Sequence, residues 1–186
     1  MTALFGTPDI AIGMKERVSR VRLFDGPLDL SWRHCATTSD FIADLFALRF
    51  QSSRNDYREM RHSIGYLTNE LVENAVKFRA PGEVVIEASM DSDCFKLKVS
   101  NDVDAENASQ FQSLLADITA GDPADLLIQR IESNAANPDA GGSGLGLLTL
   151  MSDYSAQLAW IFSSADESDR ICLETYASIP ISQAHN

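Results

Sequence analysis

The chain has 186 residues, of which 45% are hydrophobic, and its formal net charge is −12. This apolar content fills one sizeable core and leaves little for a second, so the sequence predicts a single domain. The excess of carboxylates repels phosphate backbones and anionic lipid headgroups, which argues against general nucleic-acid or membrane-surface binding.

Three further features indicate where the protein works. No apolar stretch reaches the roughly 20 residues that span a bilayer, and the first residues of the chain show no export signal. The cysteines are three in number and widely spaced, a pattern typical of thiols in a reducing compartment. We therefore expect a cytoplasmic protein.

The first half of the chain predicts a strand followed by two helices. Residues 28–32 alternate apolar and polar side chains, which indicates a half-buried strand with Trp32 in the core. A helix capped by Thr38 or Ser39 follows, with Phe41, Ile42, Leu45, Phe46 and Leu48 on its apolar face. A second helix runs from about Asp56 to Phe78, where Ala80-Pro81-Gly82 ends it.

The second half of the chain alternates between strand-like and helical patterns. The expected strands are residues 83–90, 94–100, 157–162 and 170–176, and the expected helices are 108–118, 124–131 and 145–154. Because strands pair as hairpins while helices come together, we expect an α+β fold. The natural packing is a two-layer α/β sandwich, with a mixed, mostly antiparallel sheet and helices on one face.

One stretch of the chain is unusually acidic. Residues 101–140 hold eight carboxylates and one arginine, a local charge of −7, together with Pro123 and Pro138. This composition predicts an insertion within the domain. The expected organisation is an N-terminal segment over 1–27, irregular or an added strand, a domain over 28–177 and a tail over 178–186.

A glycine-rich loop opens the predicted helix at 145–154. Gly142-Ser143-Gly144-Leu145-Gly146 exposes backbone N–H groups at a helix N-terminus, an arrangement that can hold a phosphate. It matches neither a dinucleotide fingerprint, because Leu147 replaces the third glycine, nor a P-loop. A plain surface turn is the alternative reading of this loop taken alone.

A polar stripe follows the buried face of the long helix. Glu70, Asn74 and Lys77 recur at i, i+4 and i+7. Together they supply a proton acceptor, a neutral Mg²⁺ ligand and a phosphate partner. The alternative for this stripe is a solvated helix face with a surface ion pair.

Taken together, these motifs resemble those of the GHKL superfamily of ATP-binding proteins, which includes gyrase, Hsp90, histidine kinases and MutL. Residues 69–78 resemble its N box, residues 142–147 its second glycine box, and the acidic insertion stands where the family places its nucleotide lid. The resemblance implies a Bergerat ATP-binding fold over residues 28–177, a lid at about 102–140, and ATP and Mg²⁺ as cofactors. It assigns Mg²⁺ to Asn74 and nucleotide binding to Asn74, Lys77, Asn101, Gly142, Ser143, Gly144, Leu145 and Gly146.

Within that superfamily the chain is most similar to anti-sigma-factor serine/threonine kinases, and to the SiaB-type protein kinases among bacterial partner switches. The strand and helix expected before the N box, and Glu70 four residues before Asn74, carry this resemblance. It implies an ATP- and Mg²⁺-dependent serine/threonine kinase with Glu70 as catalytic base. The implied partner is a small STAS-like antagonist protein, which the kinase phosphorylates or sequesters, and the implied assembly is a homodimer.

The first glycine box departs from the family pattern. Residues 101–105 read Asn-Asp-Val-Asp-Ala in place of D-x-G-x-G, and strand alternation puts Asn101 on the pocket side and Asp102 on the other side. An amide oxygen accepts one hydrogen bond but brings a competing donor and no charge, which weakens adenine recognition. The altered box therefore leaves a catalytically inactive binding module that sequesters its partner as one alternative. A stand-alone ATPase whose lid drives conformational change is a further alternative.

Overall fold

The computed structural model describes residues 2–12, 18–24, 30–136, 144–164 and 170–181. Within these ranges six strands form one sheet in the order β1-β5-β6-β4-β3-β2, and every neighbouring pair is antiparallel. The central hairpins β3–β4 and β5–β6 meet where β4 pairs with β6, and β1 and β2 form the two edges. The strands are β1 Thr2–Gly6, β2 Ser19–Phe24, β3 Glu83–Met90, β4 Cys94–Val103, β5 Gln157–Ser164 and β6 Ile171–Pro180.

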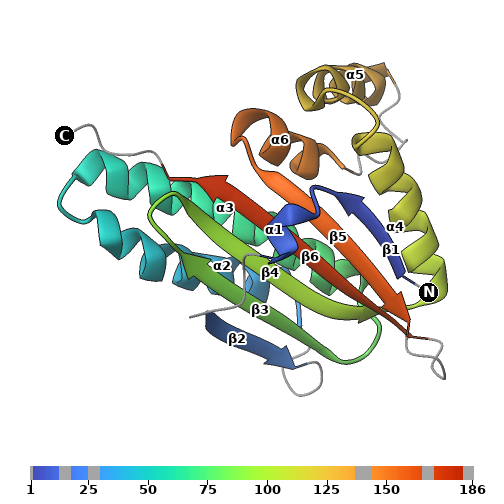
Figure 1. Ribbon diagram of the computed structural model, residues 1–186, viewed down its shortest axis with the longest axis horizontal. Coiled ribbons are helices and arrows are strands. Elements are labelled where there is room, and N and C mark those ends of the chain that lie inside the picture. Colours follow the sequence, from blue (N-terminus) through green and yellow to red (C-terminus); the bar gives the residue numbers. More distant parts are fainter. Residues whose placement is uncertain (1, 13–17, 25–29, 137–143, 165–169, 182–186) are drawn as a thin grey trace.

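The longer helices form a second layer against this sheet. Figure 1 shows α2 and α3 behind the sheet, the short α1 in front of it, and α5 at the top, away from the strands. The expected α+β, two-layer α/β sandwich is thus confirmed, with a wholly antiparallel sheet among the described strands. The helices are α1 Asp9–Ile12, α2 Trp32–Ala47, α3 Arg54–Phe78, α4 Ala105–Ile118, α5 Pro123–Ala136 and α6 Leu145–Asp153.

The two faces of the sheet differ in chemistry because successive side chains alternate between them. On β4, Phe95, Leu97 and Val99 are fully buried toward the helices. The intervening Lys98 lies on the open face, where its Nζ is 2.5 Å from a carboxylate oxygen of Glu174. The core therefore lies between the sheet and the helical layer.

Helix α3 is the longest helix of the helical layer, and its predicted bounds agree with the observed ones to within two residues. Ser53 caps it by accepting a hydrogen bond from the backbone N–H of Asp56, and Leu67 and Leu71 lie on its buried face. The helix ends at Phe78, just before Pro81, because proline cannot continue a helix. This end of α3 positions the predicted N-box residues.

The strand expected at residues 28–32 is wrong where the structure describes it, because α2 already begins at Trp32. Nδ1 of His34 accepts a hydrogen bond from the backbone N–H of Ser31 at 3.1 Å, which stabilises the first turn of a helix. Trp32 is 65% exposed rather than in the core. Residues 28 and 29 lie outside the described ranges, and the strand that precedes α2 is β2.

The predicted apolar face of this helix is also partly wrong. Phe41, Leu45 and Leu48 point to solvent, with exposed fractions of 56%, 43% and 52%. The prediction is confirmed for Ile42, which is buried, and the buried face of α2 also includes Ala43. Tight packing on α3 selects this face, because Ala43 lies beside Gly65 of that helix. In the described part of the chain, no helix has the length and apolar character needed to cross a membrane.

Candidate functional site

The predicted polar stripe of α3 meets the start of α6. Glu70, Asn74 and Lys77 line a cavity of about 160 Å³, and residues 144–146 form the opposite wall. Tertiary packing therefore brings together two motifs that lie far apart in the sequence. Gly142 and Ser143, which were assigned to the same loop, lie outside the described residues, and their role stays a prediction.

The first turn of α6 is built to open onto this cavity. Gly144 has a φ of +93°, a left-handed conformation that favours glycine. Its carbonyl accepts the first helical hydrogen bond, from the N–H of Leu148 at 3.0 Å. The N–H groups of the first turn have no partner within the helix. They place the positive end of the helix dipole at the cavity wall.

An aromatic cluster holds α6 in register with α3. The hydroxyl of Tyr154 lies 3.0 Å from Nε2 of His62, and the rings of Tyr66 and Tyr154 stack with centroids 5.1 Å apart. His62 is exposed, as expected. Because His62, Tyr66 and Glu70 follow each other at one-turn spacing on α3, this cluster continues directly into the cavity.

Glu70 and Gly146 approach each other closely inside the cavity. A Cβ atom at position 146 would lie 1.8 Å from Oε2 of Glu70, so any side chain there would force the Glu70 carboxylate to move. The carboxylate of Glu70 therefore lies against the first turn of α6. An anionic group is already placed where the helix N-terminus can stabilise negative charge.

Burial, and secondarily the charge of Glu73, raises the pKa of Glu70 above its ordinary value. Glu73 itself turns elsewhere, because one of its carboxylate oxygens accepts a hydrogen bond of 2.9 Å from Nδ2 of Asn69. It lines a separate hollow with Cys35 and Arg79. Glu70 is thus the carboxylate of this stripe that faces the cavity.

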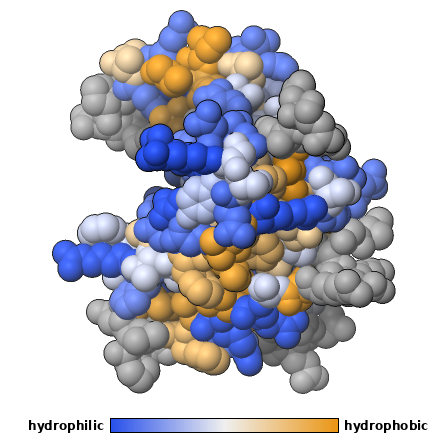
Figure 2. Space-filling view, turned by 90° about the vertical axis from the view of Figure 1, so that its left-hand side faces the viewer, coloured by the Kyte–Doolittle hydropathy of each residue, from blue (hydrophilic) through white to orange (hydrophobic). Residues whose placement is uncertain are grey.

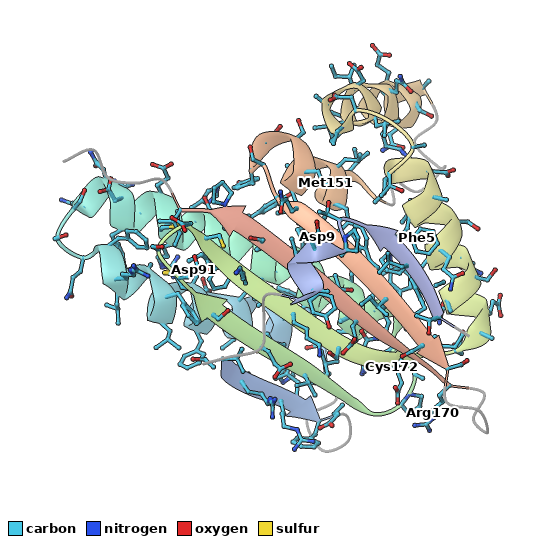
Figure 3. The ribbon with its side chains drawn as sticks, in the orientation of Figure 1. Phe5, Asp9, Asp91, Met151, Arg170 and Cys172 are labelled. Atoms are coloured by element: carbon cyan, nitrogen blue, oxygen red, sulfur yellow. The ribbon has the colours of Figure 1, made fainter. Side chains whose placement is uncertain are left out.

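A smaller cavity of about 10 Å³ adjoins the first one on the sheet side. Asn101, Thr175 and Trp160 line it, and Asn101 is only 4% exposed. The predicted alternation at the end of β4 is confirmed, because Asp102 lies on the opposite face, 4.0 Å from Arg170. Figure 3 shows Arg170 at the end of the sheet away from the β3–β4 turn.

Phe111 of α4 occupies the space next to Asn101. Its ring stacks on Phe78 with centroids 6.0 Å apart and meets Trp160 edge-on at 6.5 Å. Pockets for drug-sized ligands measure roughly 300–1,000 Å³, which exceeds the two cavities together. Phe111 lines both cavities.

The sequence did not predict Phe111, Thr175 or Trp160 as wall residues of this site. Strand alternation along β6 could have placed Thr175 on the inner face. The role of Trp160 could not be found that way, because its pattern indicates only a core residue, and it is fully buried. Its buried indole N–H has no acceptor among the described residues.

Comparison with solved structures identifies a similar fold. One chain in "The crystal structure of SiaB-SiaC complex from Pseudomonas aeruginosa" superposes with a TM-score of 0.57 at 18% sequence identity, over 88% of this chain and 91% of that chain. No family model matches the sequence, and no curated protein sequence matches it. The similarity shows that the two chains share a fold.

Proposed function

We propose that this chain is an ATP- and Mg²⁺-dependent serine/threonine protein kinase of a partner-switching system. The observation that carries the proposal is the convergence of Glu70, Asn74 and Lys77 on the N-terminus of α6. A base, a neutral oxygen ligand, a cation and a set of backbone donors are the groups that phosphoryl transfer uses.

The residues divide into two tasks. The backbone N–H groups of residues 145–147 and the ammonium of Lys77 would bind phosphate oxygens. The amide oxygen of Asn74 would serve as a Mg²⁺ ligand, since Mg²⁺ prefers oxygen donors and keeps several waters. Bound Mg²⁺ would neutralise charge that develops on the transferred phosphoryl group.

Glu70 would act as the general base. Its carboxylate faces the cavity and would accept the proton of a serine or threonine hydroxyl on the partner. The raised pKa brings this base closer to neutral pH, which improves proton transfer as long as the group remains ionised.

The partner is proposed to be a small STAS-like regulatory protein. The similar fold was crystallised in a complex of two proteins, SiaB and SiaC, and the sequence motifs resemble those of anti-sigma-factor kinases. Both observations support a chain that acts on another protein rather than on a metabolite.

Two measurements test the proposal together. Purified protein, labelled ATP, Mg²⁺ and a lysate depleted of nucleotide should yield one labelled small protein. Mg²⁺ and ATP should also raise the melting temperature of the wild type, and Asn74→Ala should remove most of that shift. Asn55→Ala, at an exposed asparagine near the start of the same helix, is the matched control. An unchanged melting temperature at millimolar ATP would refute the assignment of the pocket.

One observation favours a second candidate, a binding module that sequesters its partner without turnover. Phe111 fills the sheet side of the pocket, where a nucleobase would have to enter. In that case the wild type would bind its partner tightly but transfer no label. A stand-alone ATPase would instead release phosphate from ATP without any partner.

A further inference from the structure

Helix α5 carries an apolar stripe that points away from the rest of the molecule. Ile128 and Ile131 are 56% and 52% exposed, and the exposed Ala124 and Ala135 extend the same face by one turn at each end. We call these four residues the α5 stripe. Figure 2 shows hydrophobic surface at the top of the molecule, where α5 lies in Figure 1.

The side of α5 that faces the body of the protein carries both apolar and polar residues. Gln129, Arg130 and Ser133, together with Leu126, line a hollow of about 330 Å³ that α4 and α6 complete. A surface helix ordinarily turns its apolar face inward and its polar face outward. Helix α5 follows this rule with Leu126 and Leu127, which pack against the core, but it also exposes the α5 stripe, and none of its residues is fully buried.

Exposed apolar residues at contiguous helical positions indicate an interaction surface rather than random surface composition. The stripe runs along most of a 14-residue helix, which is roughly 21 Å long. This length suits the packing of another helix along it, because the rows of side chains on two helices interlock.

The charges beside the stripe identify the partner's chemistry. Asp125 and Glu132 are exposed and flank Ile128 on one side, three residues before and four residues after it. Neither carboxylate forms an ion pair with a described residue. Asp122 adds a third exposed carboxylate at the start of the helix, where it accepts hydrogen bonds from the N–H groups of Ala124 and Asp125.

We propose that the α5 stripe is a docking surface for an amphipathic helix of a partner protein. The apolar face of that partner helix is a row of leucine-type side chains, flanked by Lys or Arg. A second copy of this chain fits poorly, because it would bring its own acidic flank against this one. An anionic membrane surface is disfavoured by the same repulsion.

The position of the stripe connects it with the candidate kinase site. Helix α5 packs on α6, and the first turn of α6 forms one wall of the cavity with Glu70 and Asn74. A partner held on α5 therefore lies on a helix that packs against one wall of the cavity. This role in kinase action rests on the proposed function, whereas the docking itself does not require nucleotide.

The test uses a designed, fluorescein-labelled helical peptide of about four turns with a leucine ridge flanked by lysines. Its affinity for the wild type is measured by anisotropy at about 50 and 300 mM salt. The double variant Ile128→Ser/Ile131→Ser should weaken binding at least about tenfold, because both isoleucines lose their buried contact. Asp125→Asn/Glu132→Gln should flatten the salt dependence.

The controls match the test residues closely. Phe41→Ser/Leu48→Ser removes two apolar side chains of the same exposed fractions, 56% and 52%, one on α2 and one at the residue that follows it, and should leave peptide binding unchanged. A second peptide, with glutamates in place of the lysines, should bind far more weakly. All variants should keep the wild-type melting temperature, because the replaced side chains are exposed.

Four results would overturn the inference: no binding of the lysine peptide to the wild type, equal binding to Ile128→Ser/Ile131→Ser, equal binding of the glutamate peptide, or a wild-type dimer that the same variant dissolves. Peptide binding without any effect of ATP on the protein would instead overturn the proposed function alone. The two proposals therefore fail separately.

Discussion

Glu70 shows how one residue can couple folding and chemistry. Its carboxylate lies against the backbone of Gly146, in a position that no side chain at 146 would permit. Burial in this place raises its pKa. The folded protein therefore binds a proton at Glu70 more tightly than the unfolded chain does.

A stability prediction follows from the sign of this shift. A raised carboxyl pKa favours folding below the ordinary value of 4.5, and this advantage is lost as pH rises through the folded-state pKa. Glu70→Gln mimics the protonated form, so we expect it to be more stable than the wild type at neutral pH. The difference should vanish as pH falls below 4.5.

Thermal unfolding across pH checks this prediction, with Glu59→Gln, an exposed glutamate on the same helix, as the control. If Glu70 is also the catalytic base, the same variant should lower phosphoryl transfer by roughly two to four orders of magnitude while keeping nucleotide binding. A variant less stable than the wild type at neutral pH would show that the carboxylate is stabilised rather than strained by its position.

At the scale of elements, α4 is the part that closes the site. Phe111 is 7% exposed and its ring contacts Phe78, Trp160 and Phe162. Asp104 caps the helix by accepting a hydrogen bond of 2.7 Å from the N–H of Asn107. Helix α4 thus starts directly after β4, and its Phe111 ring fills the space beside Asn101.

We expect Phe111→Ala to lower stability and to strengthen ATP binding. Truncating a buried phenylalanine typically costs about 3–5 kcal/mol of unfolding free energy, and the space it leaves lies next to Asn101 and Thr175. Calorimetric titration with Mg²⁺ and ATP should show a lower dissociation constant than for the wild type.

Phe5→Ala is the control for this prediction, because Phe5 also packs edge-on against Phe162 but does not line either cavity. It should cost stability without changing ATP affinity. A weaker affinity in Phe111→Ala would mean that the ring supports the nucleotide rather than blocks it.

At the scale of the whole molecule, acid stability depends on carboxylates that the fold holds ionised. Asp91 at the β3–β4 turn accepts hydrogen bonds from the N–H groups of Asp93 and Cys94 at 2.9 and 2.8 Å, and these bonds hold its pKa far below the ordinary value. Figure 3 shows Asp91 at the opposite end of the sheet from Cys172. This turn therefore contributes to stability far from the candidate site.

The sign at Asp91 is opposite to that at Glu70. A lowered pKa adds stability above the ordinary value of 3.8, and this stability is lost as pH falls further. Asp91→Ala should therefore lower the melting temperature at neutral pH, and its difference from the wild type should shrink in acid. Asp93→Ala, two residues further along the same turn, is the control, and a difference that is independent of pH would contradict the prediction.

Much of this architecture could be predicted from local patterns. The three- and four-residue spacing of Leu67 and Leu71 predicted α3, and the alternation of Phe95, Leu97 and Val99 predicted both β4 and the inward position of Asn101. These patterns work because each reflects one face of one element. The start of α2 was missed because the capping bond between Ser31 and His34 outweighed a short apolar alternation.

The sequence by itself determined the element types, the α+β class and the polar stripe of Glu70, Asn74 and Lys77, because these depend on residues close together along the chain. Only the tertiary structure decided that Gly146 meets Glu70, that Phe111 fills the space beside Asn101, and which face of α5 is exposed. Such contacts join distant segments, and their geometry follows from how whole elements pack. Local periodicity carries no information about that packing.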